Sequence, residues 1–372
     1  MSKRAKFSPA NWSDLPQDLV LSIARRIGSA QDFVTFGAVC KTWSRAFTKQ
    51  DFLGGLTHAV PLLMLPKYSD NTQECYNLTR GRFCRLDINL SEAKAKRMPP
   101  KWYYCHSSLG WLILPPQNED SSNPVCMFHP FNHTRIVLPT YGDGDSIENF
   151  VLSSSPSFPS DYTAMISYRW TRRAAFWRPK DKRWINVSLP TRPPNLYGNC
   201  FDDIAFYKGQ FYVAERMPLY ENFLVCDIDD HKAEGKLSNL KSNLFPCHGG
   251  KRTEHLNLVE SAGDLLVVLR YSFESSHRIV GFRVFKVPFD TDDWTEVEDL
   301  GNRALFLGDN SSFSVETSPG YSRCKANCIY FTTDRVCRQQ CGVFSMEDRQ
   351  VKPLLHKFAW FENPYIWIQP SL

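Results

Sequence analysis

The sequence predicts a mainly β protein with a small α domain at its N-terminal end. Aromatic residues make up 14% of the 372 residues, an excess that suits sheet faces better than helical bundles. Helical periodicity is confined to the first fifty residues. After residue 58 it gives way to short apolar runs, each bounded by Gly, Asn, Asp or Pro, as in a meander of strands.

The N-terminal segment is expected to form three short helices. Apolar residues recur at every fourth position from Leu15 to Ile27, which gives the first helix an apolar face. A second helix is expected to start near Ser29, and a third carries Trp43. Three short helices bury too little surface to be strongly stable alone, so this segment is expected to dock onto another molecule.

Two stretches of this segment, WSDLPQDLVLSIARRI and DFVTFGAVCKTWSRAF, resemble the F-box in its plant form. The resemblance is specific, because several fixed spacings must coincide within a short segment. It implies docking onto the Skp-type adaptor of a cullin-RING (SCF) ubiquitin ligase. The residues that it implies for adaptor binding are Leu15, Pro16, Leu19, Ile23, Val39, Cys40 and Trp43.

The remainder of the chain repeats one kind of hairpin, an apolar strand, a polar turn and a second strand. Six copies, aligned on one apolar residue each, are separated by 52, 48, 49, 60 and 59 residues. A period near fifty with four strands per unit is typical of kelch-like propeller blades, whereas a pair of β-sandwiches would not need so even a spacing. The sequence therefore predicts a β-propeller of about six blades. The aligned residues are Tyr76, Phe128, Phe176, Val225, Phe285 and Phe344.

Several segments of this region, among them GWLILPP, MFHPFNHTRIVLP, FWRPKDKRW and NCIYFTTD, are similar to a plant family, the KIB-type β-propeller. The resemblance covers the chain from about residue 60 to its end, and its most specific part is the stretch LGNRALFLGDN. In that family the propeller usually follows an F-box, and its loops are the implied contact for a target protein.

These patterns divide the chain into three parts. Residues 1–10 are expected to be flexible, residues 11–55 to form the F-box, and residues 56–372 to form the propeller.

Within the propeller, the pieces SLGWLIL, YKGQFYV and SAGDLLVV each read as strand–turn–strand with Gly near the turn. Residues 365–368 are expected to complete a blade with residues 61–65, because closing the ring removes exposed strand edges.

The function that follows from both resemblances is that of a substrate-recognition subunit of an SCF ubiquitin ligase, which is not itself an enzyme. It would bind the adaptor, and through it the cullin, and hold an unidentified protein target for ubiquitination and proteasomal degradation. The alternative is a β-propeller binding protein, or a lectin-like or enzyme-like propeller with no ligase role. That alternative needs convergent acids, a metal cluster or an aromatic cradle, and the sequence identifies none.

Composition excludes other classes of partner and compartment. The net charge of +5 is a mild excess for this length, so no nucleic-acid partner is expected. The longest strictly apolar run has five residues, far short of the roughly 20 that span a bilayer, so no membrane partner is expected. Twelve cysteines without an evident export signal indicate reduced thiols in the nucleus and/or the cytoplasm. No cofactor is predicted.

Three groups of side chains are candidates for chemical sites. Cys324, Cys328, Cys337 and Cys341 have a spacing that zinc permits, but strand starts at two of them favour buried thiols, so no metal is predicted. The adjacent Asp202 and Asp203 are expected to point to opposite strand faces, which suits a structural role better than paired catalysis. The histidines, also interpreted as structural, are His106, His129 and His133.

A basic and aromatic stretch from Arg169 to Trp184 is a candidate patch for an acidic partner. The competing interpretation is a blade hairpin whose charged side chains are simply solvated. The arginines of this candidate patch are Arg169, Arg172, Arg173, Arg178 and Arg183.

Overall fold

The structure is a computed structural model. It describes residues 11–24, 30–46, 61–69, 72–78, 81–87, 105–114, 125–141, 146–157, 161–190, 200–216, 221–229, 234–243, 251–273, 278–291, 293–308, 311–317, 324–333, 341–355 and 365–369. Residues 1–10, expected to be flexible, lie outside this described part.

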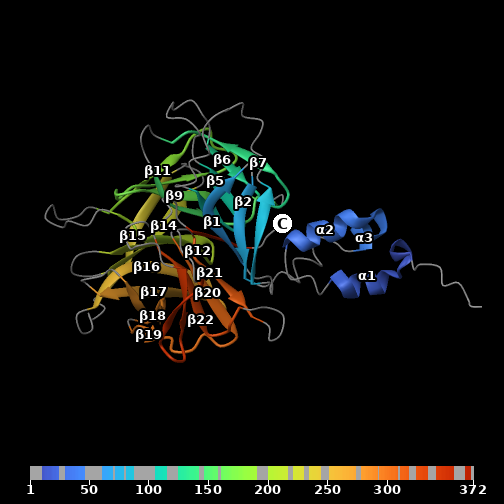
Figure 1. The fold of residues 1–372 in the computed structure, drawn as a ribbon. Coiled ribbons are helices and arrows are strands. Elements are labelled where there is room, and N and C mark those ends of the chain that lie inside the picture. The colour runs from blue at the N-terminus through green and yellow to red at the C-terminus, as the bar shows by residue number, and fades with distance from the viewer. Residues whose placement is uncertain are drawn as a thin grey trace, which may run out of the picture.

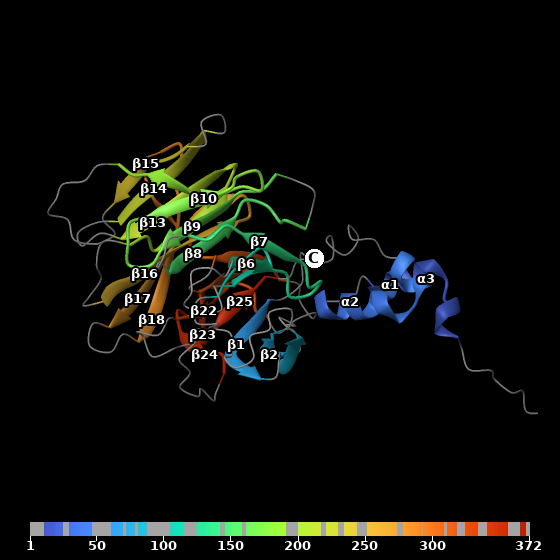
Figure 2. The same cartoon turned by 90° about the horizontal axis from the view of Figure 1, so that it is seen from above.

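The N-terminal segment is helical. A 3-10 turn, η1 (Trp12–Asp14), is followed by α1 (Gln17–Ala24), α2 (Ala30–Val39) and α3 (Lys41–Ala46). The helices stand to one side of the strands in both views of Figures 1 and 2. Among the described residues, no helix combines the length and the hydropathy that a bilayer crossing requires.

Proline sets the start of α1. The carbonyl of Pro16 accepts hydrogen bonds from the backbone N–H groups of Leu19 and Val20, both at 3.1 Å. Proline has no N–H of its own, so a position before the first helical turn loses no hydrogen bond.

Two four-stranded sheets come first along the chain. One contains β1 (Leu62–Ser69), β2 (Thr72–Asn77) and β3 (Arg82–Asp87), and the last strand, β25 (Ile366–Ile368), pairs with β1 at its edge. The other is a meander of β4 (His106–Ser108), β5 (Trp111–Leu114), β6 (Val125–Phe128) and β7 (Arg135–Leu138).

An eight-stranded sheet follows, made of two antiparallel meanders. The first meander contains β8 (Ile147–Leu152), β9 (Ala164–Tyr168), β10 (Ala174–Trp177) and β11 (Ile185–Ser188). The second contains β12 (Asp203–Tyr207), β13 (Gln210–Arg216), β14 (Glu221–Asp229) and β15 (Glu234–Asn243). They join through a short parallel contact in which Val187 and Ser188 of β11 pair with Gly235 and Lys236 of β15.

The last two sheets contain nine strands in the described part of the chain. A four-stranded meander consists of β16 (Lys251–Ser261), β17 (Asp264–Phe273), β18 (Ile279–Lys286) and β19 (Thr295–Glu296). The other, in the order β21-β20-β22-β23-β24, consists of β20 (Arg303–Leu307), β21 (Phe313–Glu316), β22 (Cys328–Thr332), β23 (Cys341–Ser345) and β24 (Val351–Pro353). This sheet has five strands, one more than the four expected per unit, and β20 lies between β21 and β22.

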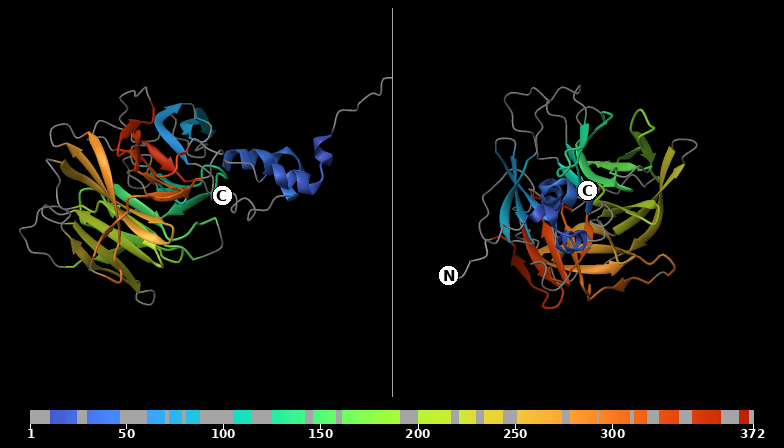
Figure 3. Two further views of the ribbon diagram at one scale, coloured as in Figure 1. Left: turned by 90° about the horizontal axis from the view of Figure 1, so that it is seen from below. Right: turned by 90° about the vertical axis from the view of Figure 1, so that its right-hand side faces the viewer.

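The sheets are arranged as a β-propeller, which confirms the mainly β architecture that the sequence predicts. Strands at the sheet edges contact one another in succession, β25 with β4, β4 with β8, β8 with β12, β12 with β16, and β16 with β21. Figure 3 (right) shows the sheets following one another around a common centre, with the last strands beside the first. The described residues form five hydrogen-bonded sheets and not six, because β11 and β15 join two meanders.

The expected ring closure is confirmed. Leu62, Leu63 and Met64 of β1 pair with Ile368, Trp367 and Ile366 of β25 in antiparallel register. The first sheet is thus built from the start and the end of the propeller, and β25 covers the edge of β1 that would otherwise be open.

The three predicted hairpins are also confirmed. Each has a two-residue turn in which both residues have positive φ, as at Lys208 and Gly209 (45° and 85°) or Ala262 and Gly263 (53° and 84°). This is the type I′ turn, whose twist matches that of the flanking strands and which favours Gly at its second position.

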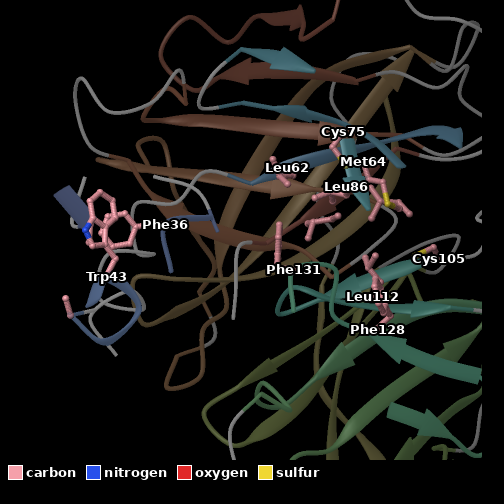
Figure 4. Packing of buried hydrophobic residues seen from close by; sticks show 14 of the residues in the cluster. Phe36, Trp43, Leu62, Met64, Cys75, Leu86, Cys105, Leu112, Phe128 and Phe131 are labelled. Carbon is pink, nitrogen blue, oxygen red and sulfur yellow. The ribbon is translucent and has the colours of Figure 1, made fainter. Parts of the chain in front are cut away.

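Apolar side chains fill the space between neighbouring sheets. Met64, Cys75 and Leu86 of the first sheet belong to one buried cluster with Leu112 and Phe128 of the second (Figure 4). Similar clusters lie between the other sheets, so each blade buries both faces and depends on both of its neighbours.

Candidate functional site

Helix α1 has apolar residues on two faces, only one of which is buried. Val20 and Ala24, one turn apart, are 0% and 1% exposed and form the helix's inner face. Leu19 and Ile23, also one turn apart, are 47% and 38% exposed. Pro16, three residues before Leu19, is exposed as well. We call Pro16, Leu19 and Ile23 the α1 outer face.

The remaining residues that resemble adaptor contacts occupy different environments. Leu15 is half-buried and packs against the buried cluster of the helices, whereas Val39 at the end of α2 is 54% exposed. Cys40 lies between α2 and α3 and is half-buried, and its Sγ accepts a hydrogen bond from the backbone N–H of Trp43 at 3.5 Å.

Trp43 is a core residue of the helical segment. It is 9% exposed, and its ring centroid lies 4.6 Å from that of Phe36 on α2 (Figure 4). Its Nε1–H donates a hydrogen bond to the carbonyl of Trp12 at 3.0 Å, which ties η1 to α3. Trp43 therefore holds the three helical pieces together, and it would support an interface by positioning other residues.

Exposed apolar side chains are concentrated on this small segment. Trp12, Leu19, Ile23 and Val39 are all large, apolar and at least 38% exposed within a short stretch of chain. Clusters of exposed apolar side chains are typical of protein–protein interaction sites. Trp12, at 65%, was not among the predicted contacts, although an aromatic residue three positions before Leu15 could have indicated it.

Three of the five arginines of the predicted patch form ion pairs within the chain. Arg169 forms an ion pair with Glu148 at 2.6 Å, and Arg178 forms one with Asp181 at 2.8 Å. Arg172 pairs with Glu215 at 2.7 Å and also donates to the carbonyl of Pro190 at 3.1 Å.

The other two arginines of the patch lie in different turns. Arg173 follows the β9–β10 turn, where its guanidinium lies 4.7 Å from the ring of Tyr168, whereas Arg183 is exposed in the turn after β10. The four residues of β10 separate the two turns by about 13 Å, at roughly 3.3 Å per residue. Arg169 and Arg178 thus stabilise their own meander, whereas Arg172 links it to β13 of the next one.

The cysteine array does not close around an ion. Cys328 and Cys341 begin β22 and β23, as expected, but Cys328 lies opposite Ser345 and Cys341 opposite Thr332. The two thiols are thus at opposite ends of paired strands, about 13 Å apart, whereas zinc holds sulfur atoms at about 2.3 Å. Cys324 is 6% exposed, and Cys337 lies outside the described residues. Within the described residues no group of three or more His, Cys, Asp or Glu side chains gathers as a metal site would.

The two adjacent aspartates bind the same neighbouring strand. Asp202 Oδ2 accepts a hydrogen bond from the backbone N–H of Leu256 at 3.0 Å, and Asp203 Oδ2 accepts one from Leu258 at 2.9 Å. The expectation that they point to opposite faces is therefore wrong, since both carboxylates reach β16. Leu256 and Leu258 are two residues apart, so their N–H groups point to the same edge of β16, an edge with which no described strand pairs.

The aspartates therefore act as structural links between blades. Asp203 Oδ2 also accepts from Ser312 Oγ at 3.1 Å, which connects β12 to β16 and to the segment before β21. Asp202 forms an ion pair with Arg216 at 3.4 Å. Ser108 has a similar role, because its Oγ accepts from the N–H of Leu152 on β8 at 3.0 Å.

Burial dominates the titration of these two carboxyls. It raises the pKa of Asp203 to about 7, against the opposing effect of the hydrogen bonds from Leu258 and Ile204. Burial likewise raises the pKa of Asp202 to about 6, although Arg216 and the Leu256 N–H lower it. His255 has a pKa lowered by burial and by Arg270 and Arg216.

The folded-state pKa of Asp203 predicts a pH-dependent effect of its replacement. Because this pKa lies above the unfolded value of about 3.9, the native chain binds more protons, and the contribution of Asp203 to stability falls as pH rises from about 4 through about 7. Asp203→Asn does not titrate. The stability of wild type relative to Asp203→Asn should therefore fall by roughly 3 kcal/mol between pH 5 and pH 8.

Urea unfolding of the full chain and of the variant at four pH values between 5 and 8 measures this difference. Because the pKa of His255 is lowered, its contribution to stability rises with pH. This contribution is the same in both proteins and cancels in the difference. Asp264→Asn, which removes a carboxyl with a 40% exposed side chain, is the matched control and should keep the wild-type pH dependence. A pH-independent gap between wild type and Asp203→Asn would contradict the prediction.

The three histidines also have local structural contacts. His106 Nε2 lies 3.1 Å from the carbonyl of Ile147, which links β4 to β8. His129 is 0% exposed, and its Nδ1 accepts hydrogen bonds at 3.3–3.4 Å from two backbone N–H groups of the β6–β7 turn. His133, in the same turn, has a φ of 59°.

Known proteins resemble this chain over nearly its full length. It is 23% identical to the F-box protein SKIP23 of Arabidopsis thaliana, over 92% of this chain and 88% of that protein. It is 24% identical to a second F-box protein of the same plant, At4g35733, over 97% and 98% of the two chains. Among solved structures, a functionally unknown protein from Desulfotomaculum acetoxidans is 8% identical with a TM-score of 0.40, over 84% of this chain and 90% of that one.

A family model covers most of the propeller. Residues 75–345 match the KIB1-4 beta-propeller, a span that begins in β2 and ends with β23. The match includes each of the meanders described above and the β20–β21 hairpin. The chain therefore belongs to the KIB1-4 beta-propeller family.

Proposed function

We propose that this protein is a substrate-recognition subunit of an SCF ubiquitin ligase. The observation that carries the proposal is the α1 outer face, an apolar stripe that the chain's own core does not cover. It lies in a segment that resembles the F-box. The two F-box proteins named above are also similar to this chain over most of their own length. In this division residues 11–55 form the adaptor-binding F-box and residues 56–372 the propeller that binds the target.

The mechanism needs no reacting group in this chain. The helical segment binds the Skp-type adaptor, which connects to the cullin, while the propeller holds the target protein. A target lysine is thereby kept near a ubiquitin-loaded partner at an effective concentration that short tethers raise to about the millimolar range. The protein acts as a non-catalytic receptor, in the nucleus and/or the cytoplasm.

The proposed propeller has six blades. Each half of the eight-stranded sheet is an antiparallel four-strand meander, and only two residues of β11 pair with β15. Counting these halves separately gives six blades, with β25, β4, β8, β12, β16 and β21 as the innermost strands. The contacts between successive innermost strands support this count.

Co-purification tests the proposal. The tagged full chain should recover a Skp-type adaptor and a cullin from plant extract, and a chain lacking residues 1–50 should recover neither. The truncated propeller should still bind its target, which should then accumulate in cells that express it. Equal recovery of adaptor and cullin by both chains would contradict the proposal.

A further inference from the structure

Two cysteines face each other across a pair of strands in the first blade. Cys75 of β2 and Cys84 of β3 are direct partners in the antiparallel register. Cys75 is 0% exposed and Cys84 is half-buried, and neither forms a disulfide. Both belong to, or pack against, the apolar cluster that contains Met64 and Leu86 (Figure 4).

This register brings the two side chains within reach of a covalent bond. Direct partners in an antiparallel pair have Cα atoms about 4.5 or 5.5 Å apart, and their side chains lie on the same face of the sheet. Disulfides span Cα separations of about 4.4–6.8 Å, so either kind of pair meets the Cα requirement without a change in register. Disulfides also need Cβ atoms about 3.5–4.5 Å apart, against about 4.5–5.5 Å for directly opposed residues, so closure requires a small approach of the two side chains.

No other cysteines in the described strands share this arrangement. Cys126 of β6 lies between Leu114 and Val137, and Cys226 of β14 lies between Phe211 and Leu237. The described cysteines of β22 and β23 likewise lie opposite residues other than cysteine. The pairing of Cys75 with Cys84 is thus specific to the hairpin beside the closing strand.

We propose that Cys75 and Cys84 are an oxidisable dithiol, which a low-molecular-weight disulfide such as oxidised glutathione converts into a cross-strand disulfide. The Cys84 thiolate, the more accessible of the two, attacks one sulfur of the small disulfide and releases one small thiol. The Cys75 thiol then loses its proton and attacks Cys84 Sγ, which forms the protein disulfide and releases the second small thiol. Two protein thiols are oxidised, and one small disulfide is reduced to two thiols.

The environment of Cys75 determines how the two steps differ. Burial, the neighbouring Cys84 and Glu74 raise the pKa of the Cys75 thiol. The second step should therefore become faster as pH rises, and a mixed disulfide on Cys84 should persist longer at lower pH. The product would fix β2 to β3 in the blade that also contains both ends of the propeller.

Peptide mapping of the native full chain tests the proposal. The protein is incubated with oxidised glutathione at pH 8, blocked with N-ethylmaleimide, and digested with trypsin without reduction. Cleavage after Lys67, Arg80, Arg82 and Arg85 leaves Cys75 in peptide 68–80 and Cys84 in peptide 83–85. A disulfide between these two peptides, with no maleimide on either cysteine, is the expected result.

Two controls separate this outcome from general thiol reactivity. In Cys84→Ser, Cys75 should remain reduced and take up maleimide after denaturation. In wild type, the half-buried Cys126 is the matched control, and it should give only a glutathione adduct or remain reduced. Recovery of Cys84 solely as a stable glutathione adduct, or of both thiols as maleimide adducts, would overturn the proposal.

Discussion

A chain truncated before β25 should fail to form a stable propeller. Ile366, Trp367 and Ile368 are each at most 1% exposed, and β25 supplies the edge partner for β1. Burial of three such side chains contributes roughly 5–9 kcal/mol, which is comparable to the whole stability of a typical domain. Truncation also exposes the edge of β1, whose unpaired backbone groups can pair with another chain and cause aggregation. Expression, solubility and thermal melting of a chain ending at residue 361 measure the effect.

A point variant refines this test. The ring of Trp367 lies 5.0 Å from that of Phe306 in an edge-on contact, so β25 is anchored to the preceding blade as well as to β1. Trp367→Ala should cost about 3–5 kcal/mol, as large-to-small changes of buried aromatics do. Trp170, which is 81% exposed, provides the matched control, and Trp170→Ala should cost less than about 1 kcal/mol. A soluble truncation with the wild-type melting temperature would show that the ring does not need β25.

The repeat could be predicted because it reports local structure. All six aligned residues fall on strands, and five of them fall on the third strand from the centre of the ring, in β2, β6, β10, β14 and β18. An apolar residue before a polar turn recurs because every blade needs the same buried hairpin. The pairing of β25 with β1 was predictable for a related reason, since an open ring would leave two unpaired edges.

Other features depend on contacts that no local pattern encodes. Helical periodicity identified the stripe containing Leu19 and Ile23, but only the packing shows that Val20 and Ala24 form the core and that the stripe faces outward. β20 pairs with β21 in antiparallel register and with β22 in parallel register, although β21 lies between β20 and β22 in the sequence. The aspartates at 202 and 203 bind β16, more than fifty residues away, and strand alternation within β12 could not reveal that.

Removing two side chains from the α1 outer face should abolish adaptor binding without unfolding the protein. Leu19→Ala with Ile23→Ala deletes large exposed side chains, so the expected effect on stability is within about 1 kcal/mol. If these residues anchor the adaptor, each truncation costs about 1–4 kcal/mol of binding, roughly ten- to a thousandfold in Kd. Titration of purified full chain with a Skp-type adaptor measures Kd, and Leu15→Ala with Pro16→Ala should weaken binding in the same way.

The propeller offers a matched control for this surface. Val137 on β7 is 63% exposed, so Val137→Ala removes a comparable apolar side chain from a different part of the molecule. It should leave adaptor binding unchanged. Wild-type affinity in the Leu19/Ile23 double variant would show that the α1 outer face is not the docking surface.

Substitutions at Trp43 should separate folding of the helical segment from docking. Trp43→Ala removes the contact with Phe36 and the hydrogen bond to Trp12, so helical content and adaptor binding should be lost together. Trp43→Phe keeps an aromatic ring against Phe36 and loses only the hydrogen bond, and it should retain most of both. Circular dichroism measured alongside Kd distinguishes the two roles. Loss of binding in Trp43→Phe with intact helices would instead identify the indole as a direct contact of the adaptor.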